Sequence, residues 1–439
     1  MAEKQGLVDS AKSIIRELNR RGFSAYMVGG YVRDRLLGRA VKDIDIATSA
    51  TPDQVVALFP HTAATGVKHG TVTVIMDGQG FEVTTFRSEA GYSDLRRPDQ
   101  VRFITDLTED LSRRDFTINA MAMDADEALY DPFHGMEDLR TATLRCVGDP
   151  KRRFSEDALR MLRCVRFAAE YKLEIEKTTW HALVHNRHKL AHIAMERVQM
   201  ELARIVAGSD PARGAKLLAA SGLLAHTKTA LPVLFHPNVV AEADSLLSLI
   251  PLFHESAHKW AFMLIALRID ANDGGKLLKS LKFAKHMQHR TLALVRLHEW
   301  MANELSRLSA RSDDFPSSLQ NIWRAGCVRF SPASMSVWLD LMNLAAHASG
   351  KLPGELSAEI FAALYGQAFV LRKRMPVAAP ADLSVNGSDL LRITARSPGP
   401  WLGKLLDKLY EEVIYERVPN DRERLCQRAL ELIRDGADT

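Results

Sequence analysis

The spacing of apolar and polar residues divides the chain into two stretches of different character. Residues 5–21 predict an amphipathic helix, and from residue 26 to about residue 147 short apolar runs of strand length mix with helical segments. After about residue 150 the pattern becomes one of long helical periodicity with few β-branched runs. We therefore predict a small α+β head followed by an all-helical remainder.

Within the head, the clearest pair of strands is a hairpin. Residues 71–76 and 81–86 are β-rich runs, and Asp77-Gly78-Gln79-Gly80 between them is a turn sequence. Because side chains alternate along a strand, Glu82 and Thr84 should share one face.

The composition narrows the class of protein without indicating its function. At 439 residues the chain can form roughly two to four domains, or one elongated body of several parts. A hydrophobic content of 46% and a charged content of 26% are typical of a globular protein. The net charge of +4 and a pI near 8.8 are weakly basic, so the local placement of charge matters more.

The cysteines and the N-terminus indicate the compartment. The four cysteines form neither a CxxC pair nor a zinc-binding spacing, which favours reduced thiols. The N-terminus lacks the order of a signal peptide, and no apolar run approaches the ~20 residues that span a bilayer. We expect a cytoplasmic protein without a membrane partner, and no protein partner is indicated.

The most informative segment begins with a glycine pair. Residues 26–28 predict a short strand, and residues 31–37 predict a short helix. Gly29 and Gly30 between them allow a tight turn and close approach of a ligand. The free N–H groups at the start of such a helix favour phosphate.

Two aspartates occur a few residues later. Asp43-Ile44-Asp45-Ile46 predicts a strand whose alternation places Asp43 and Asp45 on one face. Adjacent carboxylates repel each other unless a cation lies between them, and Mg²⁺ is bound by carboxylates together with substrate phosphates. A glycine pair alone or an Asp-x-Asp alone is ordinary, but their spacing, with Arg33 between them, predicts a phosphate loop beside a metal site.

This arrangement resembles the nucleotidyltransferase superfamily that includes DNA polymerase beta. More narrowly, it is similar to the bacterial-type (class II) CCA-adding enzymes, or tRNA nucleotidyltransferases, and to their poly(A) polymerase relatives. The resemblance implies a polymerase-beta-like head over residues 1–147, a helical neck over 148–208, a helical body over 209–375 and a tRNA-binding helical tail over 376–439. It also implies that Asp43 and Asp45 hold Mg²⁺. Glu82 is a candidate third catalytic carboxylate; the alternative is a surface glutamate on a strand.

A second motif contains two arginines followed by an aspartate. Arg113 and Arg114 suit the charge-assisted binding of a triphosphate, and Asp115 can accept from a ribose hydroxyl. In isolation this triplet is usually a solvated helix start with the aspartate as its cap. The resemblance implies that Arg114 holds the nucleotide and that Asp115 selects ribose, and it makes Asn119 a further candidate.

A third motif implies the choice of base. Asp157 and Arg160 are three residues apart on a predicted helix and should neighbour each other. An acceptor beside a donor matches the pairing edges of cytosine and adenine, whereas guanine and uracil present the reverse order. The resemblance gives this pair the role of a template made of protein; the alternative is a surface ion pair. Arg163 or Arg166 is a candidate phosphate contact.

Other segments extend the resemblance. Residues 87–103 resemble the flexible loop of the full CCA-adding enzymes, and residues 131–135 resemble a hinge in which His134 replaces the usual glycine. Residues 194–202 resemble a structural turn of the neck, although Ala194 lacks the usual capping hydroxyl. The segment 383–420 resembles a tRNA-binding tail that carries five cations: Arg392, Arg396, Lys404, Lys408 and Arg417.

One motif is typical of a different class of enzyme. His254, Glu255 and His258 match the HExxH pattern of zinc peptidases. No histidine extension comes after it, and no further glutamate occurs before Glu299, so a chance match is the favoured interpretation.

Together, these features predict an enzyme that adds CCA to the tRNA 3′ end from CTP and ATP, with two Mg²⁺ ions and release of pyrophosphate. Arg33 and Arg114 are expected to brace the triphosphate. A poly(A) polymerase is the first alternative, disfavoured by residues 66–73 and by the lack of a strongly basic C-terminal extension. A non-catalytic RNA-binding protein is the second, disfavoured by the intact Asp43, Asp45, Arg114 and Asp157.

Overall fold

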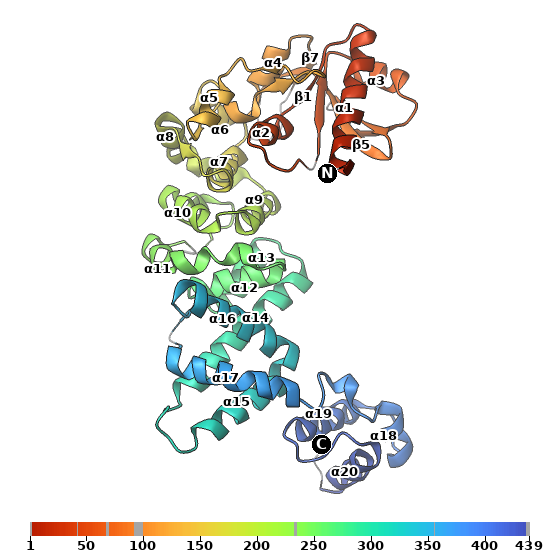
Figure 1. Ribbon diagram of the computed structural model, residues 1–439, viewed down its shortest axis with the longest axis vertical. Coiled ribbons are helices and arrows are strands. Elements are labelled where there is room, and N and C mark those ends of the chain that lie inside the picture. The colour runs from red at the N-terminus through yellow and green to blue at the C-terminus, as the bar shows by residue number, and fades with distance from the viewer. Residues whose placement is uncertain are drawn as a thin grey trace. The chain divides into compact units, whose positions relative to one another are not determined.

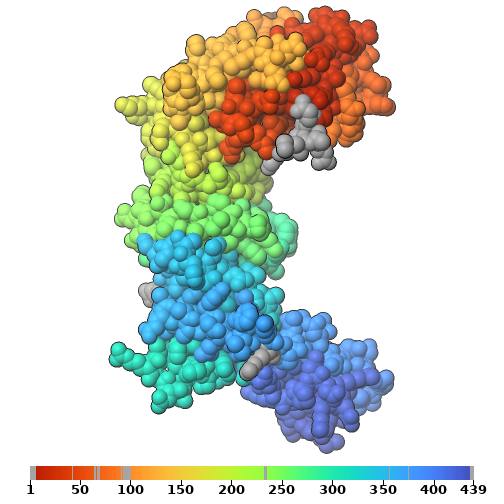
Figure 2. Space-filling model, viewed as in Figure 1, coloured from red at the N-terminus to blue at the C-terminus, as the bar shows by residue number. Residues whose placement is uncertain are grey.

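A computed structural model describes residues 2–41, 43–66, 70–91, 100–231, 235–354 and 356–435. The chain forms two compact units. The first contains Met1–Pro237 and Ser280–Lys282, and the second contains Asn238–Lys279 and Phe283–Thr439. Figure 2 shows the chain coloured by residue number, from red in the first unit to blue in the second.

The head is built on a seven-stranded mixed sheet with the order β3-β4-β5-β2-β1-β8-β9 (Figure 1). Strands β2 and β5 run parallel, whereas the other neighbouring strands are antiparallel. The strands are β1 (Ala25–Val28), β2 (Asp45–Thr48), β3 (Thr62–Gly66), β4 (Thr71–Met76), β5 (Gln79–Thr85), β8 (Ala122–Met123) and β9 (Leu129–Tyr130).

The predicted hairpin is confirmed as β4 and β5. Its turn residues Asp77 and Gly78 have φ values of 52° and 74°, the left-handed pair that twists a two-residue turn to match its strands. The amphipathic helix α1 (Ala2–Arg20) packs on β1 and β2, and α3 (Pro52–Leu58) packs on β4 and β5 (Figure 1). These helices cover the apolar side chains of the strands.

The central strands β1 and β2 contribute to the hydrophobic core of the head. Val28 and Ala47 of β1 and β2 belong to one core cluster with Phe86 and Leu111. Leu111 lies in α4 (Leu107–Ser112), and beyond it the chain reaches the short 3₁₀ turn Thr117–Asn119. Smaller head elements are β6 (Arg87–Ala90), β7 (Gln100–Phe103), α5 (Gly135–Arg140) and β10 (Thr143–Leu144).

The predicted hinge forms a tight turn before α5. His134 adopts a left-handed φ of 60° where the resembling pattern has glycine. Asp131 holds the turn, since its carboxylate accepts from the backbone N–H groups of Gly135 at 2.7 Å and Met136 at 2.9 Å. A Cβ on Gly135 would lie 2.3 Å from the carbonyl oxygen of Thr117, so only glycine fits there.

The rest of the first unit is almost entirely helical. Helix α7 packs against α9 and α10, and α6 packs against α8. The absent capping hydroxyl at Ala194 is confirmed, because α9 begins after it without a side-chain cap. The bounds are α6 (Pro150–Glu156), α7 (Leu159–Glu170), β11 (Glu174–Ile175), α8 (Lys177–Asn186), α9 (Met195–Ala207) and α10 (Pro211–Ser221).

The second unit is helical throughout its described residues. Helix α14 packs against α12, α15 and α16, and the last three helices pack against one another. Its helices are α11 (Pro237–Leu247), α12 (Ser256–Ala266), α13 (Ala271–Ser280), α14 (Lys285–Ser306), α15 (Phe315–Phe330), α16 (Pro332–Ser349), α17 (Ala358–Arg374), α18 (Gly387–Thr394), α19 (Pro400–Ile414) and α20 (Arg422–Arg434).

The predicted fold class, an α+β head followed by helices, is confirmed. The division at residues 147, 208 and 375 is finer than the two units and stays a prediction. Among the described helices, none has both the length and the apolarity that crossing a bilayer requires.

Candidate active site

A pocket of about 550 Å³ in the first unit collects the residues that the sequence singled out. Every predicted site residue lines it except Glu82. The lining side chains include seven arginines and four aspartates, so the pocket is polar with an excess of positive charge. The lining residues are Gly29, Gly30, Arg33, Asp43, Asp45, Arg113, Arg114, Asp115, Asn119, Asp157, Leu159, Arg160, Arg163, Arg166, Phe167 and Arg197.

The glycine pair makes room for an arginine. Gly29 follows β1 with φ of +68°, and Gly30 begins the predicted short helix as α2 (Gly30–Leu36). A Cβ on Gly29 would lie 2.9 Å from Nη1 of Arg114, so the guanidinium packs directly on the backbone turn. The buried Nε of Arg114 has no hydrogen-bond partner among the described residues. Arg114 is thus a lining residue of the pocket and not part of a solvated helix start.

The two aspartates of the predicted metal site both face the pocket. Strand β2 begins at Asp45, two residues later than predicted, because Asp43 and Ile44 lie in the segment before it. Burial, followed by the negative charges of Glu82 and Asp43, raises the pKa of Asp45 to about 6. Asp45 keeps access to solvent in the pocket, although the surrounding protein removes part of its hydration. A bound cation would relieve this repulsion.

Glu82 lies next to this pair on the sheet. The parallel register pairs Ile46 with Val83, so Asp45 and Glu82 precede that pair on neighbouring strands and share a face. In the described part of the chain, no three His, Cys, Asp or Glu side chains are grouped in a metal-binding geometry. The fit of a cation therefore rests on Asp43 and Asp45, with substrate phosphates as further ligands.

Arg33 is held by the protein on several sides. Its Nε and Nη2 donate to the Asp34 carboxylate at 3.0 and 3.1 Å, and its Nη1 donates to Oδ1 of Asn119 at 2.5 Å. The guanidinium also lies over the rings of Tyr171 and Phe167, at 4.3 and 5.3 Å from the centroids. These contacts use three of its five N–H groups and support a positioning role.

Asp115 is buried and fully hydrogen-bonded. Its Oδ1 accepts from the backbone N–H of Phe116 at 2.9 Å and from Nδ2 of Asn119 at 3.0 Å. Its Oδ2 accepts from Nε and Nη2 of Arg163 at 2.7 and 2.6 Å. Burial raises the pKa of Asp115, but the charge of Arg163 and the Asn119 hydrogen bond outweigh it and lower the pKa to about 2. A ribose hydroxyl can therefore reach Asp115 only by replacing one of these donors.

The predicted geometry of Asp157 and Arg160 is wrong, although both line the pocket. Helix α6 ends at Glu156 and α7 begins at Leu159, so Asp157 lies in the extended bend between them with φ of −138°. Its carboxylate pairs with Arg197 at 3.0 Å instead of Arg160. Asp157 also accepts from the backbone N–H of Leu159 at 3.0 Å, which fixes it at the start of α7.

Arg160 has its own support. Its Nη1 donates to Glu156 at 2.8 Å and to the carbonyl of Arg153 at 3.2 Å, and its Nη2 donates to the carbonyl of Arg113 at 3.1 Å. The surface ion pair between Asp157 and Arg160, considered as the alternative, is absent among the described residues. Each member of the pair is instead held separately.

Sequence reasoning missed four residues at this site, one of which is the apolar Leu159. Arg197 belongs to the segment that resembles a structural turn, Phe167 carries no polar signal, and Glu156 is the buried carboxylate that holds Arg160. Only Glu156 has a local signal, because it lies four residues before Arg160, the spacing of a helical ion pair.

The described residues of the segment that resembles the flexible loop, and those of the HExxH match, do not contribute to the lining of this pocket. The segment that resembles the flexible loop lies outside the described residues from 92 to 99, and Phe103 ends β7. The histidines of the HExxH match do not share a helix, since α12 begins at Ser256 and leaves His254 before it. Glu255 forms an ion pair with Arg290. These contacts agree with a chance match.

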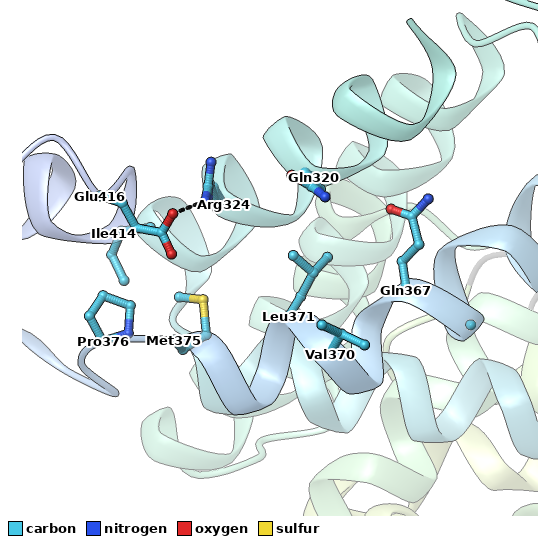
Figure 3. Close-up of a pocket in the computed structure, with 10 residues that line it drawn as sticks. Gln320, Arg324, Gln367, Val370, Leu371, Met375, Pro376, Ile414 and Glu416 are labelled. Atoms are coloured by element: carbon cyan, nitrogen blue, oxygen red, sulfur yellow. Dashed lines mark hydrogen bonds and ion pairs between the residues drawn. The ribbon is translucent and has the colours of Figure 1, made fainter. Parts of the chain in front are cut away.

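A second hollow, of about 320 Å³, lies in the helical unit (Figure 3). Arg324 of α15 and Glu416 form an ion pair of 2.6 Å at one end, and Gln320 and Gln367 lie at the other (Figure 3). Leu371 and Met375 supply apolar lining. This hollow has one carboxylate and one arginine, so it lacks the charge pattern of the pocket in the first unit.

Comparisons with known proteins identify the family of the chain. Residues 25–145 match the family described as Poly A polymerase head domain, and residues 172–232 match the probable RNA and SrmB-binding site of polymerase A. Residues 365–429 match tRNA nucleotidyltransferase domain 2. The chain is 36% identical over 425 residues to the CCA-adding enzyme of Geobacillus kaustophilus, covering 95% of each chain. The chain belongs to the family of CCA-adding enzymes.

Other members of this family support the same assignment. The enzyme is 33% identical to the CCA-adding enzyme of Limosilactobacillus reuteri over 98% of both chains. Its structure matches the crystal structure of the Bacillus stearothermophilus CCA-adding enzyme in complex with CTP, with a TM-score of 0.76, 31% identity and 98% of each chain covered. It is therefore a nucleotidyltransferase, and nucleotidyltransferases of this family generally use a divalent metal.

Proposed function

We propose that the enzyme adds C, C and A to the 3′ end of tRNA from CTP and ATP, without a nucleic-acid template, and releases pyrophosphate. The observation that carries the proposal is one pocket that joins a carboxylate pair to a group of arginines and to Asp157 and Arg160. Full-length relatives named as CCA-adding enzymes support this activity over that of a poly(A) polymerase.

The carboxylates and the arginines perform different tasks. Asp43 and Asp45 would hold Mg²⁺, which would activate the attacking 3′-hydroxyl and stabilise the charge on the leaving pyrophosphate. Arg114 lines the pocket beside the glycine turn, where its positive charge would attract the triphosphate. The excess of arginines over aspartates around the pocket matches a polyanionic substrate.

The selection of the base rests on Asp157 and Arg160. Contacts from Leu159 and Arg197 use about three of the four acceptor sites of the Asp157 carboxylate, which leaves one for the amino group of cytosine or adenine. Arg160, fixed by Glu156, would donate to the ring nitrogen beside it. Guanine and uracil would place a donor against Arg160 and an acceptor against Asp157.

The tRNA is proposed to contact the tail as well, and the reaction is proposed to take place in the cytoplasm. A fragment of tRNA that ends in CC, given ATP alone, should gain one adenosine. A tRNA that lacks CCA, given ATP alone, should not be extended into a ladder. Stepwise products resolved on a sequencing gel test both expectations, and a long adenosine ladder would favour the poly(A) polymerase alternative.

A further inference from the structure

A chain of hydrogen bonds links the turn after the glycine pair to the candidate ribose contact. Arg33 donates to Oδ1 of Asn119 at 2.5 Å, and Nδ2 of Asn119 donates to Oδ1 of Asp115 at 3.0 Å. All three side chains are buried, with exposed fractions of 6 to 7%. The hydrogen bonds from Arg33 through Asn119 to Asp115 therefore lie beneath the surface of the pocket.

The first member of this chain is immobilised. The Asp34 carboxylate accepts hydrogen bonds from two nitrogens of Arg33, and the aromatic rings of Tyr171 and Phe167 stack against the Arg33 guanidinium. A planar guanidinium that is held both in its plane and on its face loses little further freedom when it donates once more. Arg33 is therefore suited to orienting a neighbour.

The side-chain amide of Asn119 can take only one orientation. A guanidinium donates and cannot accept, so the amide oxygen of Asn119 must face Arg33. The amide nitrogen then faces the Asp115 carboxylate, which can only accept. Flipping the amide would place donor against donor and acceptor against acceptor in a buried site, which is costly. Arg33 thus determines which group Asn119 presents to Asp115.

The two oxygens of Asp115 differ in how firmly they are held. Oδ1 is fixed by the buried Asn119 and by the backbone N–H of Phe116. Oδ2 is held by Arg163, whose side chain is 32% exposed and reaches in from α7. The exposed donor is the one that a ribose hydroxyl can replace, whereas the buried pair keeps the carboxylate in place.

We propose that Arg33 is a positioning residue which, through Asn119, fixes Asp115 and so sets the preference for ribonucleotides over deoxyribonucleotides. This inference rests on the proposed function. It differs from a direct phosphate contact by Arg33, because it places the effect of Arg33 at the sugar.

The test compares CTP with dCTP. Arg33→Lys removes the forked contact, and Asn119→Asp keeps the bond from Arg33 but places a second carboxylate against Asp115. For each variant, kcat/KM is measured for both nucleotides on tRNA lacking CCA. The ratio of the CTP to the dCTP value should fall about tenfold in Arg33→Lys, the loss of about one hydrogen bond. It should fall at least as far in Asn119→Asp, where the two carboxylates also repel each other, and no further in the double variant.

Two matched controls separate positioning from general damage. Arg39 stacks on the same Tyr171 ring at 4.5 Å but does not contact Asn119, so Arg39→Lys should leave the ratio unchanged. Asn186 is also buried in the first unit, where it donates to the carbonyl of Ala182, so Asn186→Asp controls for a new buried carboxylate.

An equal loss with CTP and dCTP in Arg33→Lys would overturn the inference and assign Arg33 to the triphosphate. If that variant does not fold, Asn119→Asp decides, and an unchanged sugar ratio there would also overturn it. Failure of the unaltered enzyme to extend tRNA with CTP would instead refute the proposed function, so the two failures are distinguishable.

Discussion

At the scale of single residues, the pocket works by holding its charged groups in place before a substrate arrives. Arg33, Arg160 and Arg163 are each paired with a carboxylate of the protein. Because these partners are fixed, the arginines offer their remaining donors at defined positions. A pocket of this kind distinguishes one base from another by the hydrogen bonds that the wrong base leaves unmade, because all nucleoside triphosphates carry the same charge.

We expect Asp45 to make the activity sensitive to pH. Its raised pKa, about 6 against an ordinary 3.8, means that the folded chain binds this proton more tightly than the unfolded chain. The stabilisation is present below about pH 4 and is lost as the pH rises through 6. The proton competes with Mg²⁺, so activity at limiting Mg²⁺ should fall as the pH drops below about 6.

The competition is measured with pH–rate profiles at two Mg²⁺ concentrations. More Mg²⁺ should lower the pH at which activity falls to half on the acid side of the profile. If this pH does not change with the Mg²⁺ concentration, the assignment of Asp45 as a ligand is contradicted. Asp45→Asn, which cannot lose a proton, should be inactive over the whole range.

Asp157 is expected to control the choice of base. Asp157→Asn keeps the shape but adds a donor where cytosine also has one, so the preference for CTP over UTP should fall about tenfold or more. Single-nucleotide incorporation on tRNA lacking CCA measures this ratio. Glu196→Gln, an exposed change beside Arg197, is the control and should have no effect. An unchanged ratio in Asp157→Asn would remove Asp157 from base selection.

Exchanging the charges of Asp157 and Arg160 would be a poor test of the same idea. It would place an arginine beside Arg197 and an aspartate beside Glu156, because each residue has its own partner. The double variant should therefore lose activity with every nucleotide because of like-charge repulsion.

At the scale of elements, the turn before α5 connects β9 of the sheet to α5 through a closely packed glycine. Gly135→Ala would force a Cβ against the Thr117 carbonyl, so the free energy of unfolding should fall by about 2 kcal/mol or more. His134→Gly is the matched variant; it relieves a left-handed φ and should change stability by less than about 1 kcal/mol. Urea denaturation distinguishes them, and equal effects would show that the turn is not constrained.

Elements governed by local chemistry were predictable from the sequence. The β4–β5 hairpin and the α2 turn arise from residues adjacent in the chain, such as Gly78 and Gly29. The bend at Asp157 was not predictable, because no glycine or proline interrupts the helical pattern there. Its partner Arg197 lies 40 residues away, and only tertiary structure brings them together. The register of Asp45 beside Glu82 is likewise a property of the sheet.

At the scale of the whole molecule, the two units carry different parts of the proposed activity. The pocket proposed to bind the nucleotide lies entirely in the first unit, whereas the proposed tRNA-binding tail lies in the second. Three of the five tail cations pair with tail carboxylates: Arg392 with Asp389, and Lys408 and Arg417 with Glu411. Lys404 is exposed and has no ion-pair partner among the described residues.

Lys404 should therefore bind phosphate more effectively than Lys408. We expect Lys404→Ala to weaken tRNA binding several-fold and to lower the slope of log affinity against log salt by about 1. Lys408→Ala should do less, because its charge is already offset by Glu411. Titrations with labelled tRNA at several salt concentrations test this, and CTP binding should stay unchanged. Equal effects of the two variants would contradict the argument.

The most direct test of the central claim is extension of end-labelled tRNA that lacks CCA, with Mg²⁺, CTP and ATP, resolved on a sequencing gel. The account predicts a product longer by three nucleotides with the unaltered enzyme and no extension with Asp43→Ala. Extension that persists in Asp43→Ala, or no extension by the unaltered enzyme, would contradict it.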